Sequence, residues 1–373
     1  MKRWTFVILC LEGAVLSFNL AATSALIPSI ANSFSVAPFA AGKAVWLYML
    51  PYGLAALLYG PLSRIFDIKK IELVCLFLFS LSNLLVGLAK DINMLFAGRF
   101  FMGVFGASVT PLVLILISRL TEGNNRGKYV GTFFSITFIA SLLGLFLSGV
   151  LSWRMIYIIP AVCGLFLWVY MYLHMPSFKQ ESRSIKINYI AAFKNKAAVH
   201  MYVYIFIISL IYHGVQPWLS VYFSRKFGFE QFLISMLITL TSLSGIFGEV
   251  IGGICSDKLG RFKIMEWGLI LMVLSVFALI WNQYIFILVI IMLVWGLGWT
   301  FNHAGISTML TDLPKELLNE AASLNSSIRF LSGGLGTALG GVLMQQNINL
   351  GFFVFGASLI LLAFLSRKLV IAK

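Results

Sequence analysis

Charged and titratable side chains inside long apolar runs are the residues of this sequence that could do chemistry. The residues of this kind that lie deepest in such runs are Glu12, Arg99, His213 and His303. A charge within a membrane-spanning run is costly unless it is paired, wet or functional. A carboxyl group in an apolar site can exchange a proton at working pH, and a histidine titrates near neutrality. This pattern predicts proton or anion handling within a membrane.

The apolar runs that carry these residues are long enough to cross a membrane. Apolar residues make up 60% of the 373 residues and charged residues only 11%, against about 25% in soluble domains. Because lipid offers no partner to an open backbone group, such runs must be helices. We therefore predict an all-α integral membrane protein with twelve transmembrane helices. The predicted spans are 4–29, 43–63, 71–89, 94–118, 128–151, 154–174, 198–223, 231–255, 264–282, 284–309, 318–345 and 349–367.

The basic balance of the chain predicts its orientation. Most of the 27 Lys and Arg residues, which dominate the net charge of +14, fall between spans on the side of the N-terminus. The positive-inside rule places that side in the cytoplasm, so no nucleic-acid partner is needed to explain the charge. We expect a multi-pass protein of the inner or plasma membrane with both termini cytoplasmic. We expect the first run to be a retained span and not a cleaved signal peptide, because Glu12 interrupts it and it continues to Ile30.

A short charged loop occurs twice in the chain. The first copy is "GPLSRIFDIKK", Gly60 to Lys70, and the second is "GGICSDKLGRFK", Gly252 to Lys263. Gly60 and Gly253 are 193 residues apart, and Gly103 and Gly296 share that offset. One offset that serves several spans indicates duplication. We predict a six-helix bundle at 1–174, a cytoplasmic linker at 175–197 and a second six-helix bundle at 198–373.

The second loop resembles the most specific motif of the major facilitator superfamily, Gly-x-x-x-Asp-(Arg/Lys)-x-Gly-(Arg/Lys). The residues that match it are Gly253, Asp257, Lys258, Gly260 and Arg261. "RFFMGVFGA", which begins at Arg99, resembles the fourth-helix motif of that family, with Met102 where Gln is common. The Gly-Pro pair of many antiporters of the family is absent from 140–144. The resemblance covers the whole chain and implies a fold of two six-helix pseudo-repeats that moves a small solute by alternating access.

In that family the duplicated loop acts as a conformational latch between the halves. Its Asp lies near a helix N-terminus, where backbone amides favour an anion. In the first copy Arg64 holds the Asp position, so either Asp67 supplies the anion or the loop has decayed and Asp257 acts alone. Glu249 is interpreted as part of the latch, with Arg329 as its partner or as the partner of Asp67. The predicted latch residues are Gly60, Arg64, Asp67, Glu249, Gly253, Asp257, Arg261 and Arg329.

The predicted substrate and proton pathway combines these charges with polar and aromatic residues of the seventh and tenth spans. Glu12 is either a proton carrier or a static hydrogen-bonded carboxyl group, and His213 is the competing carrier. Arg99 is either held by carbonyl groups as a structural element or attracts a substrate anion. Asn19 stands where many proton-coupled relatives have an acid. The predicted pathway residues are Glu12, Asn19, Arg99, Tyr212, His213, Gln216, Trp299, Asn302 and His303.

The motifs that are missing restrict the function. The sequence contains no nucleotide-binding loop, His-box cluster, nucleophile motif or carbonyl filter, which argues against an enzyme, an ATP-driven pump and a channel. We expect no cofactor and no metal site, and we expect the four cysteines to be buried apolar filler. We predict a monomeric secondary transporter that exports a small organic solute in exchange for protons. Proton-coupled uptake and passive facilitation are the alternatives.

Overall fold

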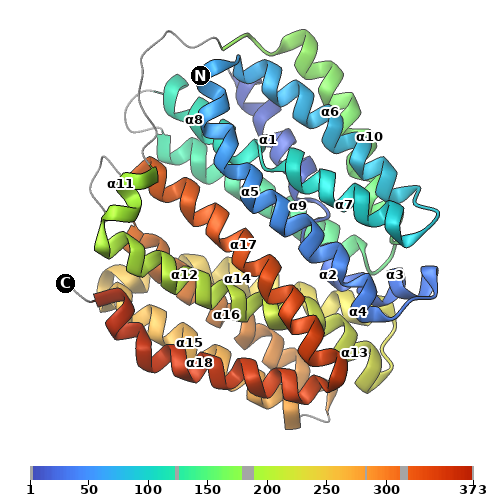
Figure 1. Ribbon diagram of the computed structural model, residues 1–373, viewed down its shortest axis with the longest axis vertical. Helices are drawn as coiled ribbons and strands as arrows, with labels where there is room; N and C mark the ends of the chain where they lie inside the picture. Colours follow the sequence, from blue (N-terminus) through green and yellow to red (C-terminus); the bar gives the residue numbers. More distant parts are fainter. Residues whose placement is uncertain (1–2, 122–125, 179–188, 282–283, 311–317, 372–373) are drawn as a thin grey trace. The chain divides into compact units, whose positions relative to one another are not determined.

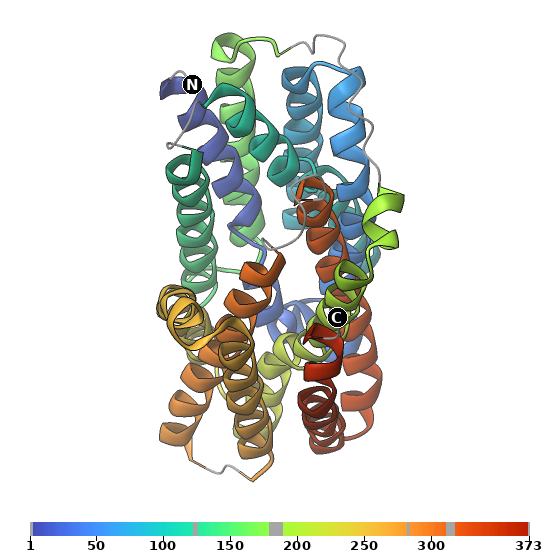
Figure 2. The same ribbon diagram turned by 90° about the vertical axis from the view of Figure 1, so that its left-hand side faces the viewer.

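The computed structural model describes residues 3–121, 126–178, 189–281, 284–310 and 318–371 (Figures 1 and 2). All regular secondary structure in these ranges is helical. Twelve helical segments, from Arg3–Ala25 to Ile348–Val370, are long and apolar enough to cross a membrane. The prediction of an all-α membrane protein with twelve spans is confirmed.

The chain divides into two compact units, Met1–Lys186 and Ile187–Lys373. The first unit contains α1 (Arg3–Ser17), α2 (Ala22–Ala25), α3 (Ile27–Phe34), α4 (Pro38–Ala41), α5 (Lys43–Ile65), α6 (Ile68–Gly87), α7 (Ile92–Gly106), α8 (Val109–Leu120), α9 (Arg126–Leu147) and α10 (Met155–His174). The second contains α11 (Tyr189–Lys194), α12 (Lys196–Val215), α13 (Leu219–Phe227), α14 (Gln231–Leu259), α15 (Arg261–Trp281), α16 (Ile285–Leu310), α17 (Leu318–Gln346) and α18 (Ile348–Ile371). The division falls inside the predicted linker, 175–197, of which residues 179–188 lie outside the described part of the chain.

The two units repeat one packing pattern. In the first unit α7 packs against α5 and α6, α10 packs against α6, and α1 packs against α9 and α10. In the second unit α16 packs against α14 and α15, α18 packs against α15, and α12 packs against α17 and α18. Each pair in one unit therefore has its counterpart in the other, as the predicted pseudo-repeat requires. Figure 1 shows α6 beside α10 and α12 beside α17 within their units.

Four glycines bring helix backbones into direct contact at equivalent places of the two units. A methyl group on Gly103 (α7) would clash with the carbonyl oxygen of Tyr48 (α5), and one on Gly296 (α16) with that of Thr241 (α14). Gly103 and Gly296 are 193 residues apart, and so are Tyr48 and Thr241. Gly144 meets the carbonyl oxygen of Phe18, and Gly336 meets that of Leu210, at an offset of 192 residues. Small residues permit such close helix approach in membranes.

Three spans that the sequence predicts as continuous are interrupted. The span 94–118 breaks between α7 and α8 at Ala107 and Ser108, because the ring of Pro111 clashes with the carbonyl four residues earlier. The span 198–223 breaks at a 3₁₀ turn, Gln216–Trp218, where Pro217 acts in the same way on the carbonyl of His213.

The first predicted span, 4–29, breaks after α1 and again between α2 and α3. Pro28 does not account for the break that follows α1, and no other proline lies near it.

The expectation for the cysteines is also corrected in part, because Cys163 is exposed and Cys255 is partly exposed.

The orientation of α6 provides a test of the predicted topology. Lys70 and Lys90 are exposed at opposite ends of this helix. We expect a cysteine at Lys70, in a cysteine-free background, to be labelled only from the cytoplasmic side, and a cysteine at Lys90 only from the outside. Labelling of both from one side by an impermeant reagent would contradict the twelve-span topology.

Candidate functional site

Arg99 lies in the core of the first unit without a carboxylate partner among the described residues. Its side chain is 1% exposed, and Nε donates a hydrogen bond of 2.8 Å to the carbonyl oxygen of Ala44. The guanidinium lies 4.4 Å from the ring centroid of Tyr48 and 5.9 Å from that of Tyr157. Cation–π contacts strengthen when the cation is removed from water. This enclosure supports the structural role for Arg99, and its predicted role with a substrate anion stays a prediction.

Asn19 belongs to a polar network at the break that follows α1. Its Nδ2 donates a hydrogen bond of 2.6 Å to Oδ1 of Asn83, and its carbonyl oxygen accepts one of 2.8 Å from Thr23. The hydroxyl groups of Thr23 and Tyr157 are also 2.8 Å apart. These bonds satisfy backbone and amide groups where the helix is interrupted. Asn19 therefore takes part in a buried hydrogen-bond network that joins the break after α1 to α6 and α10.

Glu12 meets a second acid that the sequence analysis did not select. Glu12 on α1 and Glu72 on α6 are both 0% exposed, and their carboxyl groups lie within hydrogen-bonding range of each other. Ser108 at the start of α8 places its hydroxyl 3.4 Å from Glu72. Glu72 follows the first residue of the predicted span 71–89, where a charge is ordinarily interpreted as interfacial. The burial of Glu72 was therefore not evident from its position in the sequence.

Tyr212 and Trp299 form the centre of an aromatic cluster in the second unit. Their rings are stacked with centroids 3.9 Å apart, and Trp295 stacks on Tyr212 at 5.2 Å. Trp295 Nε1 donates a hydrogen bond of 2.6 Å to Oε1 of Gln216. Tyr212, Trp299 and Gln216 are half-buried, whereas Trp295 is 1% exposed. Trp295 lies one helical turn before Trp299, and this i, i+4 spacing was the signal that could have identified it.

His213 is held by the helix that precedes the 3₁₀ turn. Its Nδ1 lies 2.9 Å from the carbonyl oxygen of Ser209, which can only accept, so Nδ1 carries a proton in this contact. Pro217 has no N–H to donate to the carbonyl oxygen of His213. This carbonyl oxygen instead accepts a hydrogen bond of 3.3 Å from Thr337. The charge of Arg329 lies within electrostatic range of the ring and disfavours a second positive charge there.

His303, Glu249 and Arg329 come together near the aromatic cluster. Nδ1 of His303 is 2.6 Å from Oε1 of Glu249, and the two side chains are 33% and 43% exposed. Arg329 interacts electrostatically with Glu249 and lies 5.8 Å from the ring centroid of Trp299. Its Nε donates a hydrogen bond of 2.8 Å to Asn325. Arg329 thus interacts with Glu249 within the second unit, and its predicted pairing with Asp67 stays a prediction.

Asn302 lies buried in the core of the second unit. It is 1% exposed, and its Nδ2 donates to the hydroxyl of Tyr204 and to the carbonyl oxygen of Met265, the latter at 3.3 Å. Both hydrogens of the amide are used in these contacts.

Within the described residues no group of three or more Cys, His, Asp or Glu residues could hold a metal ion.

Asp67 is the N-cap of α6 and ties that helix to the segment after α10. Its Oδ1 accepts hydrogen bonds of 2.9 Å from the backbone N–H groups of Lys69 and Phe178, and Oδ2 accepts one from Ser177. Burial alone would raise the pKa of Asp67. The hydrogen bonds from Ser177, Phe178 and Lys69, with the charge of Lys70, outweigh burial and hold the pKa below the ordinary aspartate value. Asp67 is therefore ionised at neutral pH, and its stabilising contribution is lost only as the pH falls through this lowered pKa.

The two copies of the loop differ in backbone conformation. Gly260, at the end of α14, has φ +98°, a conformation that L-residues other than glycine avoid. Asp67, at the matching position of the first copy, has φ −61° and needs no glycine. This difference explains why an aspartate can replace the second glycine of the motif.

The remaining latch residues lie close to these loops. Gly60 accepts a hydrogen bond of 2.7 Å from Ser63, and Arg64 in the last turn of α5 lies within electrostatic range of Arg119. A side chain at Gly253 would find open space, and Arg261 begins α15. The side chain of Asp257 lies outside the described part of the chain.

Substitution of Asp67 tests the latch. We expect Asp67→Asn to slow transport several-fold with little change in substrate affinity, because it removes the charge at the helix N-terminus and shifts the balance between conformations. Asp257→Asn is expected to act in the same way. Asp91, which caps α7 through the N–H groups of Asn93 and Met94, is the matched control, and Asp91→Asn should leave the transport rate unchanged. If Asp257→Asn impairs transport and Asp67→Asn does not, the first loop has no latch function.

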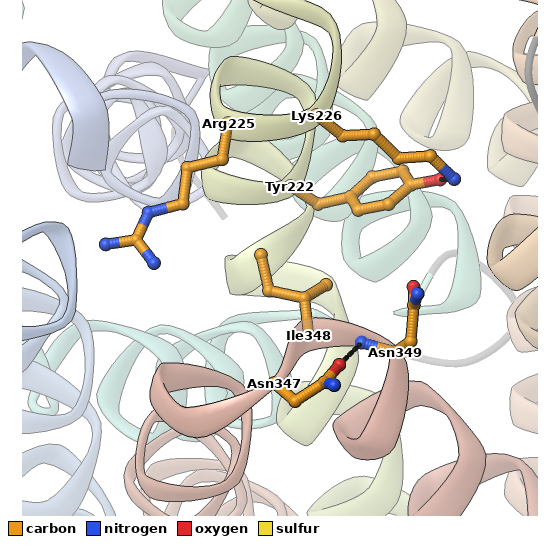
Figure 3. Close-up of a pocket in the computed structure, with 6 residues that line it drawn as sticks. All are labelled: Tyr222, Arg225, Lys226, Asn347, Ile348 and Asn349. Atoms are coloured by element: carbon orange, nitrogen blue, oxygen red, sulfur yellow. Dashed lines mark hydrogen bonds between the residues drawn. The ribbon is translucent and has the colours of Figure 1, made fainter.

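A pocket of about 200 Å³ lies elsewhere in the second unit, between the end of α13 and the start of α18 (Figure 3). It is lined by Tyr222, Arg225, Lys226, Asn347, Ile348 and Asn349. Lys226 donates a hydrogen bond of 3.1 Å to the hydroxyl of Tyr222. Figure 3 shows the two basic side chains extending to opposite sides, so their charges do not converge on one point. None of the predicted site residues lines this pocket.

Two six-helix membrane units with buried charges and clustered aromatic residues form the architecture of a solute transporter. The chain matches the family model described as Major Facilitator Superfamily over residues 9–337. It therefore belongs to the Major Facilitator Superfamily and is a transporter of small solutes, not an enzyme. The resemblance that its loop motifs indicate is confirmed.

Known relatives support this assignment. The chain is 23% identical over 378 residues to the uncharacterized MFS-type transporter YbcL of Bacillus subtilis, covering 99% of this chain and 96% of that protein. It is 24% identical over 366 residues to Multidrug resistance protein 1 of Bacillus subtilis, covering 94% and 92%. Among solved structures, a bacterial homolog of the human lysosomal transporter Spinster, inward-facing and occupied, matches with a TM-score of 0.84 and 12% identity, covering 100% and 97%. This last likeness concerns the fold alone.

Proposed function

We propose that this transporter exports a small organic compound in exchange for protons. Export is supported by the similarity along most of the chain to a protein named for multidrug resistance. The transporter works as a monomer in the cell membrane, with both termini and the linker at 175–197 in the cytoplasm.

The observation that carries proton coupling is the environment of Glu12. Its carboxyl group is completely buried, and no cation interacts with it among the described residues. A buried carboxylate without a balancing cation is costly, so the group is stable there with a proton bound. Release of that proton requires water to reach the site, which alternating access supplies once in each transport cycle.

The half-buried surface of Tyr212 and Trp299 in the second unit contributes to the substrate site. These stacked rings offer apolar faces, while Gln216, Arg329 and the pair of His303 and Glu249 offer polar and charged groups beside them. Ligand sites commonly combine a largely apolar lining with a few polar groups that fix orientation. A small compound with an apolar, flat part and a polar substituent fits this surface.

Transport in inside-out membrane vesicles with an imposed pH gradient tests the proposal. We expect a member of a panel of small metabolites and drugs to accumulate in acid-loaded vesicles, with alkalinisation of the acidic lumen as the compound enters. The opposite dependence on the gradient would identify proton-coupled uptake. Accumulation with no pH dependence would identify a facilitator and contradict proton coupling.

A further inference from the structure

The carboxyl groups of Glu12 and Glu72 present more hydrogen-bond acceptors than their surroundings can satisfy. Both oxygens of Glu12 and Oε1 of Glu72 are buried without an N–H or O–H donor. Oε2 of Glu72 has only the hydroxyl of Ser108 at 3.4 Å, and that hydroxyl lies closer, at 2.9 Å, to the carbonyl oxygen of Phe105. Buried acceptors in native proteins are almost always paired. A proton on one of the two carboxyl groups would supply a donor to the other.

No positive charge balances the two acids within the described residues. The titratable groups that face them are Cys75 on α6 and Tyr59 on α5, and the thiol of Cys75 donates to the hydroxyl of Tyr59 at 3.5 Å. From α8 the pair is faced by Ser108, and no described side chain of α9 or α10 interacts with its charge. Two carboxylates in contact in a dry site cannot both be ionised.

We propose that Glu12 and Glu72 form one proton-binding site, in which the protonated carboxyl group of Glu12 donates a hydrogen bond to Glu72. The pair, and not Glu12 alone, then holds the proton that drives transport. This inference rests on the proposed proton coupling and adds to it the residue that accepts the proton and the path by which it leaves.

The position of each acid sets its part in the pair. Glu72 lies in the second turn of α6 and has the Ser108 hydroxyl beside it. Glu12 lies in the interior of α1, and none of the described donors pairs with its carboxyl group. Glu72 also follows Asp67 by five residues, about 7.5 Å along the helix axis. It therefore stands between Glu12 and the loop at the end of the helix, and a proton that leaves Glu12 passes to Glu72 first.

Infrared difference spectroscopy of the purified protein tests the pair without any transport measurement. We expect a deuterium-sensitive carboxylic acid C=O band at neutral pH, at the low frequency of a strongly hydrogen-bonded group. Glu12→Gln should remove this band, and Glu72→Gln should shift it to higher frequency or remove it. Glu230→Gln changes an exposed carboxyl group at the start of α14 and should leave the band unchanged. An unaltered band in Glu72→Gln would overturn the proposal.

The pH dependence of transport provides the second measurement. Removing the neighbouring acid and supplying an amide donor both favour the ionised form of Glu12. We therefore expect the pH of half-maximal transport in Glu72→Gln to move toward acid by about one unit or more. If Glu72→Gln does not fold, Glu72→Asp replaces it. Glu72→Asp retains the carboxyl group and should retain the low-frequency band, and loss of that band in a folded Glu72→Asp protein would also contradict the pair.

The two measurements separate failure of the pair from failure of the proposed function. If wild-type transport has no pH dependence while the infrared band responds to both glutamates, the pair exists and proton coupling is wrong. If transport is pH-dependent while the pH profile and the band of Glu72→Gln equal those of the wild type, proton coupling stands and the pair is wrong.

Discussion

Glu12→Gln is expected to abolish transport driven by a pH gradient while leaving exchange of substrate for substrate intact. Glutamine has nearly the same shape as the protonated acid, so the packing of α1 is retained, but it cannot take up or release a proton. Exchange involves no net proton movement and needs only the substrate site and the conformational change. Gradient-driven uptake and counterflow in the same proteoliposomes measure the two activities.

His213→Gln is the comparison for this variant. We expect it to leave coupling intact, because the charge of Arg329 disfavours a second positive charge on the ring of His213. If His213→Gln uncouples transport and Glu12→Gln does not, the proton route lies in the second unit. If neither variant changes the response of transport to the pH gradient, neither Glu12 nor His213 carries the proton.

Gly103→Ala and Gly296→Ala are each expected to lower the free energy of unfolding by about 1–3 kcal/mol and to reduce transport. The added methyl group meets a backbone carbonyl oxygen, of Tyr48 in one unit and of Thr241 in the other. A backbone cannot turn aside as a flexible side chain can, so the helices must separate. Thermal unfolding of the purified variants in detergent measures the loss, and transport in vesicles measures its consequence.

Gly131→Ala is the matched control for these variants. Gly131 lies in α9, and a methyl group there would find no atom within 4 Å. Alanine is favoured over glycine in a helix interior by roughly 0.5–1 kcal/mol, so this variant should be neutral or slightly more stable. A similar loss of stability in all three variants would show that contact with a backbone carbonyl oxygen is not the cause.

The fold was predictable from the sequence because its main determinants are local or periodic. Apolar length predicts the twelve spans, and the offset between Gly103 and Gly296 predicts the repeat, which the structure shows as equivalent backbone contacts. Proline positions alone did not predict the interruptions, because α5 and α10 continue through Pro51, Pro61 and Pro160 and no proline lies near the break after α1.

The site was only partly predictable because its contacts join helices that are distant in sequence. Glu12 stood out as a charge deep in a span, whereas Glu72 stood at the edge of one and becomes a buried partner only when α1 and α6 pack in one bundle. The approach of His303 to Glu249 likewise depends on the packing of α14 against α16. For Arg99, only the structure shows that Tyr48 and Ala44 lie against its charge.

The glycine contacts described above also determine which parts of the molecule can move. A helix that touches its neighbour through backbone atoms, with no side chain between them, cannot roll or slide without collision of its carbonyl oxygens. We therefore expect four helix pairs to move as rigid bodies, namely α5–α7 and α1–α9 in one unit and α14–α16 and α12–α17 in the other. We expect any rearrangement that accompanies transport to bend the interrupted helices at 107–108 and 216–218.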